Sequence, residues 1–208
     1  MRSHPLKAFW YFLALSGCRR GEALGLQWTD IDWEQKTATI RTIQVGKASQ
    51  RRLHAPKTQS GARTLALSDL LAAILRSHQD QQRMAWSVDH AGEPLPPWVF
   101  TTRRGTWLAR DNVRRTFKIL LRRAGLPETT RIHNLRHAMA TTWLSQGVPV
   151  KVVSERLGHA SIAITLQLYA HVLPALQHAA ANQIDSWLTG TETVVEDSAS
   201  PPKEPSHG

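Results

Sequence analysis

The sequence predicts an α+β fold that is mainly α-helical and carries a small three-stranded antiparallel β-sheet. Most of the chain shows helical spacing of apolar residues between glycine or proline breaks, whereas residues 37–67 are rich in short Thr-, Ile- and Val-containing segments. The 208 residues are 41% hydrophobic, which suits one domain with a core. No run reaches the roughly 18 apolar residues of a membrane span. A single cysteine excludes a disulfide framework or a Cys-based zinc finger.

The first segment, from Leu6 to about Leu26, is predicted to be helical with a break near Gly17. Residues 1–18 also fit the outline of a bacterial lipoprotein signal, with a basic start, an apolar stretch and Cys18 at the cleavage position. The continuation favours the helix, because residues 22–26 (EALGL) resemble folded core and not the polar tether that usually follows a lipoprotein cysteine.

Three short strands are predicted next, over Thr37–Val45, Arg51–Pro56 and Arg63–Leu67. The polar turn between the last two, residues 57–61 (KTQSG), contains a glycine and would form a hairpin that carries Lys57.

The rest of the domain is predicted to be helical. Ser68 is suited to cap the first of these helices, and Gly125 and Pro127 end the second. The predicted helices cover residues 68–86, 111–124, 133–146, 149–157, 161 to about 170, and 174–187, with a proline-rich loop over 89–97. Residues 1–188 are therefore expected to form one domain, and residues 189–208 a disordered acidic, Pro- and Ser-containing tail.

The positive charge is concentrated outside that tail. The chain carries a formal +10, and without residues 190–208 it retains 25 basic against 12 acidic residues, or +13. Arg-Arg pairs occur at residues 19–20, 51–52, 103–104, 114–115 and 122–123. A solvated basic surface is one interpretation; pairs placed near predicted turns and helix ends favour a nucleic-acid partner.

Four segments could carry chemistry: residues 16–28, 56–67, 133–144 and 155–171. His133 and Arg136 are three residues apart and share a helix face, which suits one phosphate. Tyr169 follows His159 by ten residues and is a weak nucleophile with a free pKa near 10. Surrounding cations would make its phenol more acidic and able to attack phosphorus.

These segments, in this order, resemble the catalytic domain of the tyrosine recombinases, the phage-integrase family. The family pattern is an Arg in a Gly-x-Arg-x-x-Glu helix, a Lys on a β-hairpin, a His-x-x-Arg helix, a Leu-Gly-His turn and a Tyr about ten residues later. The residues that fill it are Arg19, Lys57, His133, Arg136, His159 and Tyr169. The match covers roughly residues 6–187.

The resemblance implies a site-specific recombinase that cleaves and rejoins DNA through a 3′-phosphotyrosine, without metal, ATP or any cofactor. Arg19 and Arg136 would grip the scissile phosphate, and Tyr169 would form the covalent bond. Lys57 would protonate the 5′ oxygen and His133 would assist proton transfer at the tyrosine. His159 would hydrogen-bond a nonbridging oxygen, and Glu22 would support an arginine.

The resemblance also implies partners and a location. Double-stranded DNA would be the substrate, held by a homotetramer in which the C-terminal helix, residues 174–187, packs on a neighbouring protomer. We expect a cytoplasmic, nucleoid-associated protein without a membrane partner. The family usually carries an N-terminal core-binding domain, which we expect to be absent because Met1 falls near the first helix of the catalytic domain.

Three alternatives stay open. His133 and His137 have the i, i+4 spacing of a zinc motif, although Asn134 stands where that motif has Glu. A truncated or decayed integrase could bind DNA without completing recombination. A type IB topoisomerase would use a similar site only to relax DNA.

Overall fold

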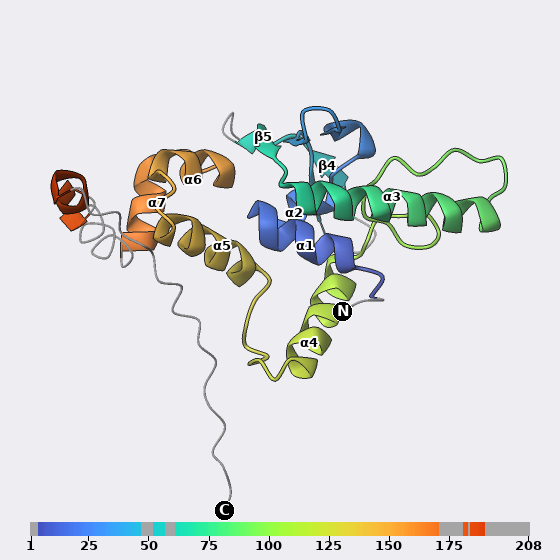
Figure 1. Ribbon diagram of the computed structural model, residues 1–208. Coiled ribbons are helices and arrows are strands. Elements are labelled where there is room, and N and C mark those ends of the chain that lie inside the picture. Colours follow the sequence, from blue (N-terminus) through green and yellow to red (C-terminus); the bar gives the residue numbers. More distant parts are fainter. Residues whose placement is uncertain (1–3, 47–51, 57–60, 171–180, 183, 190–208) are drawn as a thin grey trace, which may run out of the picture. The chain divides into compact units, whose positions relative to one another are not determined.

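The computed structural model describes residues 4–46, 52–56, 61–170, 181–182 and 184–189 (Figure 1). The chain divides into two compact units, residues 1–170 and 171–208. The described helices of the first unit are α1 (Lys7–Ser16), α2 (Arg20–Leu24), α3 (Asp69–Asp89), α4 (Arg110–Arg123), α5 (His133–Ser145), α6 (Val150–Leu157) and α7 (Ile162–Tyr169). Its strands are β1 (Ile31–Asp32), β2 (Thr37–Ile40), β3 (Ile43–Val45), β4 (Arg52–His54) and β5 (Arg63–Ala66).

The prediction of a mainly helical α+β fold with a small antiparallel sheet is confirmed, but the sheet has a different membership. Its strand order is β1-β2-β5, and β3 and β4 form a separate two-stranded sheet. The predicted strand over residues 37–45 breaks between Ile40 and Ile43, where the Thr42 hydroxyl donates to the Gly25 carbonyl at 2.6 Å. Strand β3 contacts α2 and pairs with β4, while β5 pairs with β2, so among the described residues β4 and β5 do not form the predicted hairpin pair.

Helix α1 forms the centre of the hydrophobic core. Its apolar residues Phe9, Phe12 and Leu13 are buried, and the rings of Phe9 and Phe100 meet edge to face at 5.2 Å. The helix ends at Gly17, which adopts the left-handed conformation with φ of 67° and lets the chain turn directly into α2.

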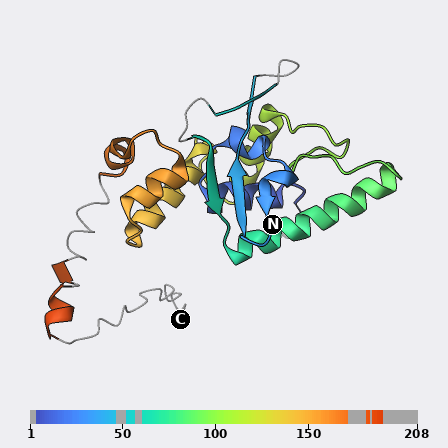
Figure 2. The same cartoon turned by 90° about the horizontal axis from the view of Figure 1, so that it is seen from above.

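The remaining helices pack around α1 on different sides. In Figures 1 and 2, α3 lies to one side of α1, and α5, α6 and α7 lie to the other. Ser68 caps the start of helix α3, and its hydroxyl accepts from the Leu71 amide at 3.3 Å. Helix α4 buries its apolar face, with Phe117 against Trp10 at 5.4 Å between ring centroids.

Helices α5, α6 and α7 follow one another closely in space: α5 packs on α1 and α6, and α6 packs on β5 and α7. Gly158 ends α6 in the left-handed conformation, and the Ser161 hydroxyl caps α7 by accepting from the Ala163 amide. The element bounds therefore lie within a few residues of the predicted ones.

In the second unit, residues 181–182 and 184–189 are described, and all of them are helical. The prediction of a helix over 174–187 falls mostly outside the described residues, as does the predicted tail. Among the described helices, none is both long and apolar enough to cross a membrane.

Candidate active site

The end of helix α6 holds three arginine side chains through three consecutive backbone carbonyls. Arg63 Nε donates to the Arg156 carbonyl at 2.6 Å, and Arg136 Nη2 donates to the Leu157 carbonyl at 2.6 Å. Arg19 Nη2 donates to the Gly158 carbonyl at 3.3 Å. The last carbonyls of a helix have no intrahelical partner and carry partial negative charge, which makes them good acceptors for guanidinium groups. The α6 terminus thus gathers cations from α2, β5 and α5.

Glu22 is the carboxylate at the centre of this group. It is fully buried and forms ion pairs at 2.9 Å with Arg19 and with Arg63. Burial alone would raise the pKa of Glu22, but the hydrogen bonds and charge of Arg63, together with those of Arg19, outweigh it and lower the pKa. The carboxylate is therefore ionised at neutral pH, and it fixes two guanidinium groups in place.

Arg136 lies on α5 and is only 3% exposed. Besides its bond to Leu157, its Nη1 donates to the Gly17 carbonyl at 2.8 Å, so it joins the end of α1 to the end of α6. Burial and the neighbouring Arg19 charge lower the pKa of Arg136 to about 10. At neutral pH it is still a cation, with its charge incompletely offset by protein groups.

His159 follows the α6 terminus and faces the same cations. Its Nδ1 lies 2.8 Å from the Thr165 hydroxyl. Burial lowers the pKa of His159 to about 4, with further contributions from Arg136 and Arg19. The ring is therefore neutral at pH 7 and offers one N–H donor.

Tyr169 closes α7 and is 3% exposed. Its hydroxyl lies 2.9 Å from Nδ1 of His137 on α5. Burial raises the pKa of Tyr169 more than the Arg136 charge lowers it. The expectation that surrounding cations make this phenol more acidic is therefore wrong for this structure. Burial destabilises the phenolate more than the positive charge of Arg136 stabilises it.

His133 lies behind His137, with ring centroids 4.5 Å apart in an edge-to-face arrangement. Burial, followed by the charges of His137, Arg136 and Arg19, lowers the pKa of His133. His133, His137 and Tyr169 form a continuous row of side chains that leads from the pocket to the phenol.

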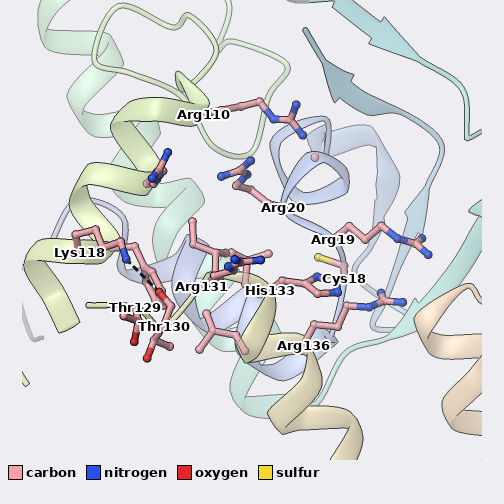
Figure 3. A pocket seen from close by; sticks show the side chains of 16 residues that line it. Cys18, Arg19, Arg20, Arg110, Lys118, Thr129, Thr130, Arg131, His133 and Arg136 are labelled. Atoms are coloured by element: carbon pink, nitrogen blue, oxygen red, sulfur yellow. Dashed lines mark hydrogen bonds between the residues drawn. The ribbon is translucent and has the colours of Figure 1, made fainter. Parts of the chain in front are cut away.

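A pocket of about 610 Å³ opens beside these residues. Arg19, His133 and Arg136 line one part of it, and Figure 3 shows the guanidinium groups of Arg19 and Arg136 extending in the same direction. A pocket lined in this way suits an anionic group with several oxygens, such as a phosphodiester.

Five of the six predicted catalytic residues, with Glu22, are brought to this region. The sixth, Lys57, lies outside the described residues. Within the part of the chain that is described, no group of three or more His, Cys, Asp or Glu side chains could hold a metal ion. His133 packs against His137, and His137 in turn packs against Tyr169.

Two residues of this site were not predicted from the sequence. Arg63 supplies two hydrogen bonds to Glu22, and His137 contacts the phenol. The i, i+4 spacing of His133 and His137 was a signal for the second, since it places both imidazoles on one face of α5. No local pattern pointed to Arg63, because its partner lies 41 residues away.

Most of this chain is similar to known proteins. Residues 2–175 match the phage integrase family. A tyrosine recombinase XerC-like protein of Caldanaerobacter subterraneus subsp. tengcongensis is 36% identical over 187 residues, covering 84% of this chain and 47% of that protein. Tyrosine recombinase XerD of Bifidobacterium longum is 33% identical over 168 residues, covering 81% and 50%. The chain spans about half the length of these curated relatives.

The fold is also shared with a solved structure. The Tn1549 transposon integrase in complex with transposon right end DNA superposes with a TM-score of 0.71 at 20% identity, over 85% of this chain and 58% of that one. The fold, the family match and the identity to the curated relatives agree, and the chain belongs to the phage integrase family.

Proposed function

We propose that residues 1–188 form the catalytic domain of a site-specific DNA recombinase that cleaves and rejoins strands through a 3′-phosphotyrosine at Tyr169. The observation that carries this proposal is the convergence of Arg19 and Arg136 at the α6 terminus beside His159, with the Arg136 charge also acting on the Tyr169 phenol. The relatives named as tyrosine recombinases support the reaction class, and the neighbour bound to transposon DNA supports DNA as the substrate.

In the cleavage step the phenol oxygen of Tyr169 attacks the scissile phosphorus. A P–O bond to tyrosine forms, and the bond from phosphorus to the 5′ oxygen breaks. The phenol proton passes to Nδ1 of His137, which lies 2.9 Å away, and His133 assists from behind. The departing 5′ oxygen takes a proton from Lys57, as the family resemblance implies.

The cations stabilise the charge that develops on the phosphate. Arg19 and Arg136 contact the nonbridging oxygens, and neutral His159 donates its Nε2 proton while Nδ1 accepts from Thr165. Because the α6 carbonyls and Glu22 already orient these groups, little reorganisation accompanies the reaction.

In the rejoining step a 5′-hydroxyl from a second strand attacks the phosphotyrosine and releases the phenol. One phosphodiester replaces another, so the exchange requires no nucleotide hydrolysis. The two arginines provide the positive charge that a metal ion supplies in metal-dependent phosphoryl-transfer enzymes.

We propose that four protomers act on two DNA sites and exchange their C-terminal helices. Deleting residues 172–208 should then abolish assembly on DNA, and unchanged assembly would refute the exchange.

The test is to capture the covalent protein–DNA intermediate from a pool of duplexes that differ in sequence. A pool of duplexes with a randomised segment is incubated with the protein in EDTA at low salt, denatured with detergent, and the protein-linked DNA is sequenced. We expect adducts enriched in one sequence. They should be lost in Tyr169→Phe and kept in Tyr11→Phe, which alters the other of the two tyrosines. DNA that is bound in a gel-shift assay but never linked would overturn the proposal.

A further inference from the structure

A second group of cations lines the same pocket, away from Arg19 and Arg136. It comprises Arg20, Arg110, Arg114, Lys118 and Arg131. In Figure 3 the side chains of Arg20 and Arg110 extend toward each other, and their guanidinium groups lie apart from those of Arg19 and Arg136. Arg19 and Arg20 are consecutive at the start of α2, where successive side chains diverge around the helix, so one short segment supplies cations to two places.

Within the described part of the chain, these charges are offset only in part, by Asp111. No Asp or Glu lines the pocket, and no ion pair joins these five side chains to a carboxylate within the described residues. The pKa of Arg20 is lowered by burial and then by the charges of Arg110 and Arg114, against which Asp111 acts in the opposite direction. Cations held close together without a partner create a site for an anion.

The Arg110 side chain gives a second indication. Its Nε is buried and has no hydrogen-bond partner among the residues that the structure describes. Its guanidinium lies over Gly21, where Nη2 would stand 3.6 Å from a Cβ atom on that residue. The side chain that carries this donor lines the pocket together with Arg20.

We propose that Arg20, Arg110 and Arg114 bind a second DNA phosphate, distinct from the scissile one. This inference rests on the proposed function and extends it to the register of the duplex. The planar donor fork of arginine fits phosphate oxygens, and phosphate contacts fix a protein's position on a duplex. A duplex anchored at Arg20 would be held in one orientation, so the second site sets the spacing between the anchored phosphate and the phosphodiester that Tyr169 meets.

The first experiment measures equilibrium binding to a short random-sequence duplex as a function of salt. The variant is Arg20→Gln with Arg110→Gln, and the matched control is Arg83→Gln with Arg103→Gln, which removes the same charge from exposed positions outside the pocket. We expect the pocket variant to lose about tenfold or more in affinity. The slope of log affinity against log salt should fall by about 0.9 for the lost phosphate. Equal slopes and affinities for the two double variants would overturn the proposal.

The second experiment observes the pocket directly. The wild-type chain has one cysteine, Cys18, which is 2% exposed and has a pKa raised to about 12 by burial, so an added cysteine is labelled selectively. A duplex should slow maleimide labelling of Thr129→Cys in the pocket and leave Thr29→Cys, an exposed position outside it, unchanged. Inorganic phosphate is the second arm: equal protection by phosphate alone would assign the pocket to a free anion and overturn the proposal.

The two proposals fail in different ways. If the wild-type protein forms no Tyr169 adduct with DNA, the proposed function fails. If adducts form but the pocket variant matches its control in salt slope and in protection, only the second phosphate site fails. Thermal melting of each variant verifies that the folded state is retained.

Discussion

Nδ1 of His137 lies 2.9 Å from the hydroxyl oxygen of Tyr169. The contact joins the middle of α5 to the last residue of α7, and it places a base beside a phenol whose pKa is raised by burial. A phenol that is protonated at neutral pH must lose its proton as it attacks, so His137 is positioned to receive it.

Replacing His137 should separate positioning from proton transfer. His137→Asn retains a hydrogen-bonding group near the phenol but cannot act as a base, whereas His137→Leu loses both functions. Under single-turnover conditions, we expect the rate of adduct formation to fall about 10²- to 10³-fold in the Asn variant and further in the Leu variant. The DNA affinity of both variants should be unchanged. His54→Asn, an exposed histidine on β4, is the control. Full activity in the Asn variant would show that His137 only positions the phenol.

Ultraviolet titration should place the ionisation of Tyr169 above pH 10. In Tyr11→Phe protein Tyr169 is the remaining tyrosine, so its phenolate absorbance is read alone. Burial raises its pKa from the ordinary 10.0, and the Arg136 charge opposes this incompletely. In denaturant the midpoint should return to about 10. A folded-state midpoint below that value would mean that the cations, and not burial, dominate.

Glu22→Gln should destabilise the fold strongly. The substitution leaves Arg63, which is 8% exposed, and Arg19 without their buried counterion. Breaking a buried pair from one side costs about 3–5 kcal/mol in the free energy of unfolding, which urea titration measures. Glu128→Gln removes the partner of Arg122 in an exposed pair and should leave the urea midpoint almost unchanged. Similar midpoints for the two variants would contradict the role assigned to Glu22.

Gly158→Ala should impair the reaction more than its effect on stability explains. Gly158 has a φ of 65°, and Gly125 after α4 has a matching φ of 66° with open space around it. Alanine at either position should cost about 1 kcal/mol of stability. Only at 158 does the strained residue offer its carbonyl to Arg19, so only that variant should form adducts more slowly. Equal adduct rates would show that the α6 carbonyls do not align the arginines.

Stability should decrease as the pH falls from about 6.5 toward 4, in part through His159. Burial, aided by Arg136 and Arg19, lowers its pKa from 6.5 to about 4 in the folded state. The unfolded chain therefore binds a proton that the folded chain excludes, so the stabilisation present above pH 6.5 is lost as the pH falls. Urea midpoints measured across this range should depend less on pH in His159→Gln. Parallel curves would refute the assignment.

The sequence by itself determined the local features of this protein. Apolar spacing and breaks at Gly17, Gly125 and Gly158 located the helices, because these signals act within one or two turns of chain. Arg19, Arg136, His159 and Tyr169 were predicted as one site from the family pattern, which is also a set of short local motifs.

Only the tertiary structure decided how these residues are held. The pairing of β2 with β5, the ion pair of Arg63 with Glu22 and the contact of His137 with Tyr169 all join segments more distant in sequence. The three carbonyls that end α6 look alike in any helix, and their function depends on which arginines the fold brings to them. Such contacts are fixed by the packing of α5 and β5 on α6, and no spacing within a segment records that packing.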